Sequence, residues 1–245
     1  MSKFVRRSIM GGVLIVFAVS CFILGSLKLG KVYVKYQNLK IANTVIQQNN
    51  DSLRTANGQL LRAWLNTISK GEKYDWVFFG NSITRNSDFR TFYRDKKILN
   101  YGLGGDDLMG MSRRTKLLGQ ITFDKLFVMS GINSVGKLPD DEFVIAYNAL
   151  LDSILVYVEP DKIIVQSMLP ISTTIEKDGF NNRRIESLNG KIREICNSRN
   201  IKFLDLYSLY ALNGSLPVDW TMDSDGLHII DSKYDKWAEA IKDVK

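Results

Sequence analysis

The sequence predicts an α/β fold in which helices cover both faces of a five-stranded parallel sheet, preceded by one N-terminal transmembrane helix. Two observations support this prediction. From residue 74 onward, short apolar runs alternate with longer amphipathic stretches, a pattern typical of β-α units. Near the N-terminus, a long apolar run contains no charged residue. We therefore divide the chain into a membrane anchor at 1–30, a helical stalk at 31–73 and a globular domain at 74–245.

The apolar run extends from Ser8 to Leu27. A helix of about 20 residues crosses the ~30 Å hydrocarbon core of a bilayer. An uncleaved anchor is favoured, because no small-x-small cleavage site followed by polar sequence ends the run. Ala18-Val19-Ser20-Cys21 is similar to a bacterial lipoprotein cleavage site, but Phe22-Ile23-Leu24-Gly25 stays apolar beyond it.

Basic residues flank the predicted anchor on both sides, so their distribution does not decide its orientation. Three basic residues precede the run and three follow it: Lys3, Arg6, Arg7, Lys28, Lys31 and Lys35. A short N-terminal tail with a free amine favours the tail on the inside. We therefore expect a single-pass membrane protein whose domain is extracytoplasmic, in the periplasm or at the cell surface.

The net charge of +7 belongs to the membrane flanks. Residues 1–50 hold seven of the 33 basic residues and none of the 26 acidic ones, so the rest of the chain is formally neutral. Such a domain has no electrostatic footprint for DNA or RNA, and we expect no nucleic-acid partner. With His228 and Cys196 as its single histidine and cysteine, the domain has too few ligands for a His/Cys metal site. We expect neither a metal nor a cofactor.

The stalk is predicted to be helical, with a polar joint at 47–52. Apolar residues then recur at helical spacing, which indicates a helix lying against the domain: Leu60, Leu61, Trp64, Leu65 and Ile68.

Five apolar runs in the domain are the predicted strands: Trp76–Phe79, Ile98–Tyr101, Leu126–Met129, Lys162–Gln166 and Lys202–Leu206. Four helices are predicted between and after them: Asp106–Leu118, Asp140–Val158, Asn181–Arg199 and Ser232–Val244. Pro160 is expected to end the second of these helices. The stripe Phe143, Tyr147, Leu150, Leu151, Ile154 and Val158 has helical spacing and is predicted to be core.

Small polar segments follow the first three strands. Gly80-Asn81-Ser82 comes after the first, Gly102-Leu103-Gly104-Gly105-Asp106 after the second and Gly131-Ile132-Asn133 after the third. Functional groups of open α/β sheets gather at the carboxyl ends of the strands. These segments are therefore the candidate site.

A serine hydroxyl needs a base to take its proton, and usually an acid to orient that base. The lone histidine of the domain, His228, follows Asp225 by three residues, a spacing that lets a carboxylate and an imidazole meet across one turn. By itself this pair is weak evidence, because an arbitrary histidine usually has no catalytic role.

Taken together, the segments resemble the SGNH/GDSL hydrolase family. Four blocks match in the family's order: Phe79-Gly80-Asn81-Ser82-Ile83-Thr84, Asn100-Tyr101-Gly102-Leu103-Gly104-Gly105-Asp106, Ser130-Gly131-Ile132-Asn133 and Asp225-Gly226-Leu227-His228. The resemblance extends through Leu169-Pro170-Ile171, Tyr234 and Trp237, and covers roughly residues 74–245. It implies a flavodoxin-like three-layer α/β/α sandwich.

The resemblance also implies roles for particular residues. Ser82 would be the nucleophile, His228 the base and Asp225 the acid that orients it. The oxyanion hole would consist of the backbone N–H groups of Ser82 and Gly105 and the side-chain amide of Asn133. Two positions depart from the family pattern, since Asn81 stands where Asp is expected and Ser134 where Asp is common.

These observations predict a serine esterase that removes a short acyl group through an acyl-serine. Its expected substrate is an acylated small molecule or carbohydrate, such as an O-acetylated envelope carbohydrate. Two alternatives stay open: an O-acyltransferase that uses the same triad, and a non-catalytic module that binds glycan or scaffolds a complex.

The sequence does not match two other functional motifs, the dinucleotide-binding fingerprint and the nucleophile elbow of α/β-hydrolases. Asp107 stands where a dinucleotide fingerprint needs its third glycine, and the chain has no Gly-x-Ser-x-Gly elbow. Asp106 and Asp107 are expected to cap the helix that follows them. Trp220 and Met222 either line a substrate pocket or pack internally.

Overall fold

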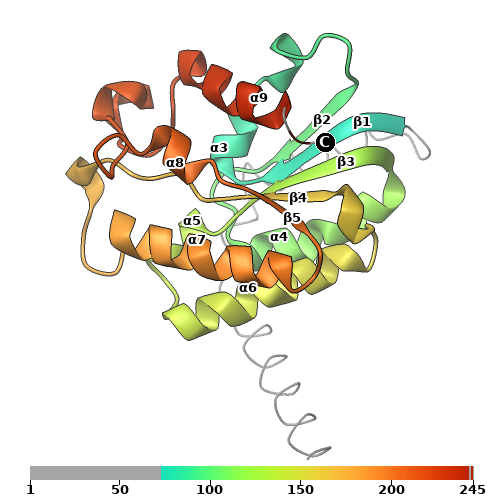
Figure 1. Ribbon diagram of the computed structural model, residues 1–245, viewed down its shortest axis with the longest axis horizontal. Coiled ribbons are helices and arrows are strands. Elements are labelled where there is room, and N and C mark those ends of the chain that lie inside the picture. The colour runs from blue at the N-terminus through green and yellow to red at the C-terminus, as the bar shows by residue number, and fades with distance from the viewer. Residues whose placement is uncertain (1–72, 243, 245) are drawn as a thin grey trace, which may run out of the picture. The chain divides into compact units, whose positions relative to one another are not determined.

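The computed structural model describes residues 73–242 and residue 244 (Figure 1). The predicted anchor at 1–30 and the predicted stalk, apart from Lys73, lie outside the described residues. Within the described part of the chain, no helix has both the length and the apolar character needed to cross a membrane.

All five strands are parallel to their neighbours, in the order β2-β1-β3-β4-β5. Their bounds are β1 Lys73–Gly80, β2 Ile98–Gly102, β3 Thr122–Met129, β4 Ile163–Gln166 and β5 Lys202–Leu204. The predicted five-stranded parallel sheet is confirmed. The strands β1 and β3 begin several residues earlier than predicted, because charged residues such as Asp75 and Asp124 separate their first residues from the apolar run.

The α-helices described are α3 Ser82–Arg85, α4 Leu108–Arg114, α5 Ile132–Val135, α6 Asp140–Leu155, α7 Asn182–Asn197, α8 Tyr207–Tyr210 and α9 Tyr234–Lys242. The four predicted helices correspond to α4, α6, α7 and α9. Helix α4 is shorter than predicted, because the chain tightens into a 3₁₀-helix at Thr115–Gln120. Helix α6 ends at Leu155, before Pro160, which instead begins a 3₁₀ turn. Three four-residue helices were not predicted, since one turn is too short for a period to be visible.

Helices cover both faces of the sheet, with α9 on one side and α6 and α7 on the other (Figure 1). Successive residues of a strand point to opposite faces. On β1, the ring of Phe78 stacks on Phe89 at 3.9 Å between centroids, and Phe89 in turn meets Trp237 of α9 at 5.1 Å. The ring of the next residue, Phe79, lies under the Arg114 guanidinium of α4 at 4.2 Å.

The predicted core stripe is confirmed, because its five residues on α6 and Val158, just beyond the end of that helix, are all buried. Tyr234 and Trp237 of α9 are buried as well, and the Tyr234 hydroxyl donates to the Ile83 carbonyl at 2.7 Å. The closing helix therefore packs against the short helix that begins with Ser82.

The register of the sheet brings three strand ends to one edge. Gly80 of β1 pairs with Gly102 of β2 and with Met129 of β3. The segments after these strands consequently leave the sheet side by side. They are the three segments in which the sequence places its candidate residues.

Candidate active site

Ser82 is the first residue of α3, directly after β1. The turn between them requires Gly80, because a Cβ there would lie 2.0 Å from the Thr84 hydroxyl oxygen and 2.9 Å from the Met129 carbonyl oxygen. Asn81 caps α3, since its side-chain oxygen accepts from the Ile83 N–H at 2.9 Å. A close turn and a side-chain cap therefore fix where the Ser82 hydroxyl points.

Helix α3 rests directly on the end of β2. A Cβ on Gly102 would lie 2.1 Å from the Arg85 backbone nitrogen, so α3 can approach this closely only over a glycine. The Asn100 side chain ties the two elements together. Its amide donates to the Thr84 and Ser87 carbonyls at 2.8 Å each, and its oxygen accepts from the Gly102 N–H at 2.8 Å.

Asp225 and His228 lie in a loop that folds back on itself. The Met222 N–H donates to the His228 carbonyl at 2.6 Å, and the Gly226 N–H donates to the Thr221 hydroxyl at 3.0 Å. Gly226 has φ of +75°, which suits glycine, and its carbonyl accepts from the Ser172 N–H at 2.8 Å. The loop is thereby attached to the segment that follows β4.

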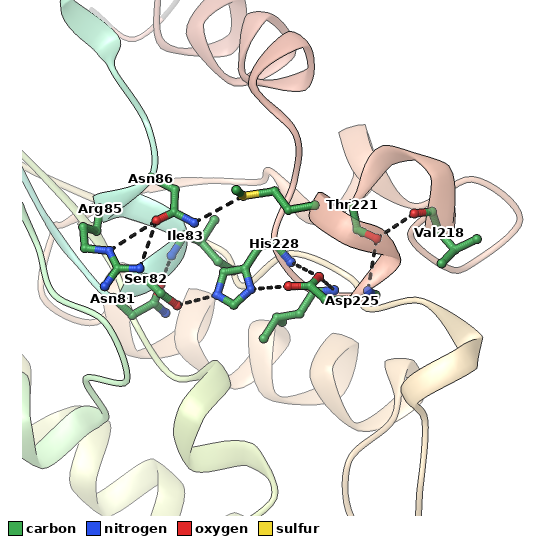
Figure 2. Close-up of polar contacts among 12 residues, drawn as sticks. Asn81, Ser82, Ile83, Arg85, Asn86, Val218, Thr221, Asp225 and His228 are labelled. Carbon is green, nitrogen blue, oxygen red and sulfur yellow. Dashed lines mark hydrogen bonds and ion pairs between the residues drawn. The ribbon is translucent and has the colours of Figure 1, made fainter. Parts of the chain in front are cut away.

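The three predicted residues meet in one chain of hydrogen bonds (Figure 2). The distance from His228 Nε2 to Ser82 Oγ is 2.8 Å, and that from His228 Nδ1 to Asp225 Oδ2 is 2.6 Å. Ser82 is 7% exposed, whereas the side chains of His228 and Asp225 are 26% and 38% exposed. The hydroxyl is therefore recessed, but the imidazole beside it is open to solvent.

The Asp225 carboxylate is held in the charged form. Partial burial acts to raise its pKa, but hydrogen bonds outweigh that effect and leave the pKa below its usual value. The Leu227 N–H and the His228 N–H each donate to Asp225 Oδ1 at 2.8 Å, and the His228 ring contacts Oδ2. An ionised Asp225 favours the imidazole tautomer with its proton on Nδ1, which leaves Nε2 free to accept from Ser82.

The predicted oxyanion-hole residues also lie beside the strand ends. Neither the Ser82 N–H nor the Gly105 N–H has an acceptor among the described residues, and Gly105 has φ of +74°. The Asn133 side-chain amide donates to the Asp106 carbonyl at 2.8 Å. This bond occupies one of its two amide hydrogens and joins the segments after β2 and β3.

A buried ion pair under these segments was not predicted from the sequence. Arg114 Nε lies 2.6 Å from Asp106 Oδ2, and both side chains are 4% exposed. The terminal nitrogens of the Arg114 guanidinium donate to two backbone carbonyls, Nη1 to that of Tyr101 at 2.6 Å and Nη2 to that of Gly80 at 2.7 Å. Arg114 thus binds the ends of β1 and β2 and the segment that carries Gly105.

The sequence places an arginine two helical turns after Asp106, but nothing in the pattern distinguishes it from the adjacent Arg113. Of the two aspartates expected to cap the helix, only Asp107 does so, accepting from the Gly110 N–H at 2.9 Å. Asp106 pairs with Arg114 instead.

The two departures from the family pattern have local structural roles. Asn81 is the cap of α3, and the Ser134 hydroxyl accepts from the Leu108 N–H at 3.2 Å. Met222 is 39% exposed, and its sulfur accepts from the Asn86 amide at 3.5 Å. Trp220 is half-buried, with the Lys233 and Lys236 ammonium groups over its ring.

No group of three or more His, Cys, Asp or Glu side chains in the described ranges is arranged to hold a metal ion. The arrangement offers a hydroxyl, an imidazole and a carboxylate in series, beside uncommitted backbone N–H groups. It can deliver a serine oxygen to an electrophilic carbon and receive the proton that the oxygen loses.

Several solved structures share the fold. One is a protein from Streptococcus pneumonia provisionally named a platelet activating factor, with a TM-score of 0.67, 22% identity and coverage of 82% of this chain and 98% of that chain. A GDSL-like lipase from Bacteroides thetaiotaomicron has a TM-score of 0.62, 19% identity and coverage of 75% and 94%. An acetylxylan esterase from Geobacillus stearothermophilus has a TM-score of 0.55, 17% identity and coverage of 72% and 96%.

Comparison with curated proteins gives no match. Residues 78–235, more than half of the chain, match the GDSL-like Lipase/Acylhydrolase family. That range contains the segments after β1, β2 and β3 and the loop of Asp225 and His228. The chain therefore belongs to the GDSL-like lipase/acylhydrolase family and is an ester-hydrolysing enzyme of that family.

Proposed function

We propose that this chain is a membrane-anchored serine esterase that removes a short acyl group through an acyl-serine intermediate, with an O-acetylated envelope carbohydrate as its substrate. The observation that carries the proposal is the 2.8 Å contact between Ser82 Oγ and His228 Nε2, with Asp225 on the far side of the imidazole. Belonging to an acylhydrolase family supports the reaction class.

In the proposed reaction, Ser82 Oγ attacks the ester carbonyl carbon while His228 Nε2 accepts the hydroxyl proton. The ionised Asp225 stabilises the imidazolium that forms. The tetrahedral intermediate collapses when its C–O bond to the alcohol breaks, and the alcohol leaves with the proton from His228. Water then attacks the acyl-serine by the same route, with His228 again accepting and returning the proton.

The negative charge of the tetrahedral intermediate would be met by the N–H groups of Ser82 and Gly105 and the free amide hydrogen of Asn133. Their assignment is supported by the absence of an acceptor for the two backbone groups among the described residues. Loss of one oxyanion donor typically lowers kcat by about 100-fold or more.

The choice of a short acyl ester rests on comparison. One structure with the same fold is an acetylxylan esterase, which makes an O-acetylated carbohydrate the first class to test. The membrane anchor and the extracytoplasmic location rest on the sequence alone, through the uncharged run Ser8 to Leu27 and the short tail before it.

The nucleophile is tested with the purified full-length chain in neutral detergent, using 4-nitrophenyl acetate as substrate. We expect Ser82→Ala to abolish hydrolysis above the uncatalysed rate. Ser153→Ala is a matched control, because the Ser153 hydroxyl donates to the Ala149 carbonyl of its own helix, α6. If Ser82→Ala retained full activity, Ser82 would not be the nucleophile.

The anchor is tested by fractionating cells that produce the full-length chain. We expect it in the membrane fraction after alkaline carbonate extraction. Replacing Val16 and Ala18 with Arg is expected to release it, because charged residues at the centre of a membrane helix are unfavourable. Release of the unaltered chain by carbonate would contradict the anchor.

A further inference from the structure

Arg85 lies one turn after Ser82 on α3. Residues three apart share one face of a helix, so the two side chains emerge as neighbours. Figure 2 shows the Arg85 side chain beside Ser82, on the side away from His228. Ser82 is recessed, but Arg85 is exposed. An exposed cation therefore lies on the same short helix as the proposed nucleophile, one turn away from it.

The Arg85 guanidinium is held against the loop that carries Gly105. Its Nε and Nη2 each contact Asn86 Oδ1 at 3.2 Å. A Cβ added to Gly104 would lie 2.3 Å from Arg85 Nη1, so the guanidinium occupies space that a side chain at that position would need. It thus lies next to the residue that precedes a proposed oxyanion donor.

The positive charge of Arg85 has no counter-ion among the described residues. Its side-chain partner there is the neutral amide of Asn86. Arg90, a few residues away, differs in this respect, because its Nε pairs with Asp88 Oδ1 at 2.7 Å. A guanidinium has five N–H donors in a planar fork, and the two that point to Asn86 leave three for a ligand.

A cavity of about 440 Å³ opens beside Arg85. Its wall includes Asn86, Ser87, Asn100 and Gly102. Two of these polar side chains already have protein partners. The Ser87 hydroxyl donates to the Thr84 carbonyl, and the Asn100 side-chain amide both donates to the Thr84 carbonyl and accepts from the Gly102 N–H. The wall also contains Asp88, Arg90 and the apolar residues Phe89, Ile98 and Leu99. Of its two arginines, Arg90 is paired with Asp88, whereas Arg85 has no carboxylate partner among the described residues.

We propose that Arg85 binds an anionic group of the substrate, a phosphate or carboxylate, and so makes the enzyme selective for negatively charged esters. The inference rests on the proposed function, because it assigns the substrate class of the same site. Arg fits both anions, since its planar fork donates two parallel hydrogen bonds to their oxygens. Arg85 is thus a specificity-determining residue that contacts substrate away from the reacting carbon.

The test uses the full-length chain in neutral detergent and acetyl esters that differ in charge. The neutral ester is 1-O-acetylglycerol, and the soluble anions are 1-O-acetylglycerol 3-phosphate and 3-acetoxypropanoate. A fourth ester, 1-palmitoyl-2-acetylglycerol 3-phosphate in micelles, presents the phosphate on a lipid. The quantity measured is the ratio of kcat/KM for each anionic ester to kcat/KM for the neutral ester.

We expect the unaltered enzyme to prefer at least one anionic ester by about tenfold or more. Arg85→Gln should lower that ratio by about 10- to 100-fold, as expected for a lost charge-assisted hydrogen-bond pair. Arg85→Lys should retain part of the preference, because it keeps the charge but not the fork. Arg193→Gln is the matched control, since Arg193 is an exposed arginine of α7 paired with Asp205, and it should leave the ratio unchanged.

The inference would be overturned if the unaltered enzyme showed no preference for anionic esters, or if Arg85→Gln had the same ratio as the unaltered enzyme. Either result would leave the esterase proposal intact.

Calorimetric titration with glycerol 3-phosphate tests anion binding independently of ester hydrolysis. Binding that weakens tenfold or more in Arg85→Gln, in a chain that hydrolyses none of the esters, would support the anion site and reject the esterase. A preference confined to the lipid ester would indicate that Arg85 binds a lipid headgroup. A preference shared by the lipid ester and the soluble phosphate ester would indicate that Arg85 binds phosphate itself.

Discussion

Within the described part of the chain, the Asp225 carboxylate accepts hydrogen bonds from its own loop, namely from the Leu227 N–H, the His228 N–H and the His228 ring. The loop itself is therefore sufficient to orient this carboxylate. The loop therefore sets both the rotamer of Asp225 and the tautomer of His228 before a substrate arrives. Only the approach of the loop to Ser82 depends on the rest of the fold.

Asp225→Asn is expected to lower kcat for 4-nitrophenyl acetate by about 10⁴-fold. An amide at this position favours the imidazole tautomer with its proton on Nε2, which cannot accept the Ser82 proton. The measurement is kcat at pH 7 to 8, with circular dichroism to show that the variant is folded. A loss smaller than tenfold would mean that Asp225 does not orient the imidazole.

The same substitution is expected to change how stability depends on pH. The pKa of Asp225 is lower in the folded chain than its usual value near 3.8, so its ionised form stabilises the fold above that pH. This contribution is lost as the pH falls through the folded pKa. Urea unfolding should therefore show a larger free energy of unfolding for the unaltered chain than for Asp225→Asn at pH 7, with the difference shrinking as the pH falls below 3.8.

At the scale of elements, the position of Ser82 depends on how closely α3 approaches β2. Gly102→Ala would place a Cβ 2.1 Å from the backbone nitrogen of Arg85, where no rotamer change can relieve the contact. We expect a loss of about 1–3 kcal/mol in the free energy of unfolding, with a fall in kcat as α3 shifts. Urea unfolding and hydrolysis of 4-nitrophenyl acetate measure the two effects.

Gly190→Ala is the matched control for that substitution. Gly190 is an exposed residue of α7, and a Cβ there would meet no atom within 4 Å. We expect it to stabilise the chain by about 0.5–1 kcal/mol, because alanine favours a helix interior over glycine. Equal effects of the two substitutions would contradict the role given to Gly102.

Arg114 joins β1, β2 and the Asp106 segment, so it supports several parts of the site at once. Arg114→Met is expected to lower the free energy of unfolding by about 3–5 kcal/mol, because Asp106 would keep a buried charge without its partner. Urea unfolding measures this, and the double variant Arg114→Met with Asp106→Leu should recover part of the loss. A single variant as stable as the unaltered chain would show that the ion pair contributes nothing.

Helices and strands could be predicted from the sequence where apolar residues recur with a regular period or form a continuous run. Strands 76–79 and 98–101 and helices 140–158 and 181–199 lie within a few residues of β1, β2, α6 and α7. The short helix α3 could not be predicted in this way, although it carries Ser82. It forms because Asn81 caps it and because Gly80 and Gly102 leave room for it, which are properties of the folded neighbourhood.

At the scale of the whole molecule, the motif blocks predicted which residues would meet, but not how they are supported. Ser82 and His228 are 146 residues apart in the chain and 2.8 Å apart in space. A single sequence shows motifs such as Asp225-Gly226-Leu227-His228, because they are local. It does not show that Arg114 reaches the Gly80 carbonyl, because that contact depends on the crossing of α4 over the sheet.

Cys196 reports on the integrity of the whole domain. It is fully buried in α7, and burial raises the pKa of its thiol to about 12. Since the thiolate is the reactive form, a Cys21→Ser chain should not react with an aromatic disulfide reagent at neutral pH until it unfolds. Reaction monitored with and without urea tests this, and rapid modification of the native chain would contradict the buried placement.

The proposed activity depends on Ser82 becoming a nucleophile because His228 lies beside it. The most direct measurement is covalent labelling of the full-length chain by a fluorophosphonate, with the modified residue identified by peptide mass spectrometry. We predict one labelled residue, Ser82, and loss of labelling in both Ser82→Ala and His228→Ala chains that remain folded. Labelling at another serine, or undiminished labelling of Ser82 without His228, would contradict the activation of Ser82 by His228.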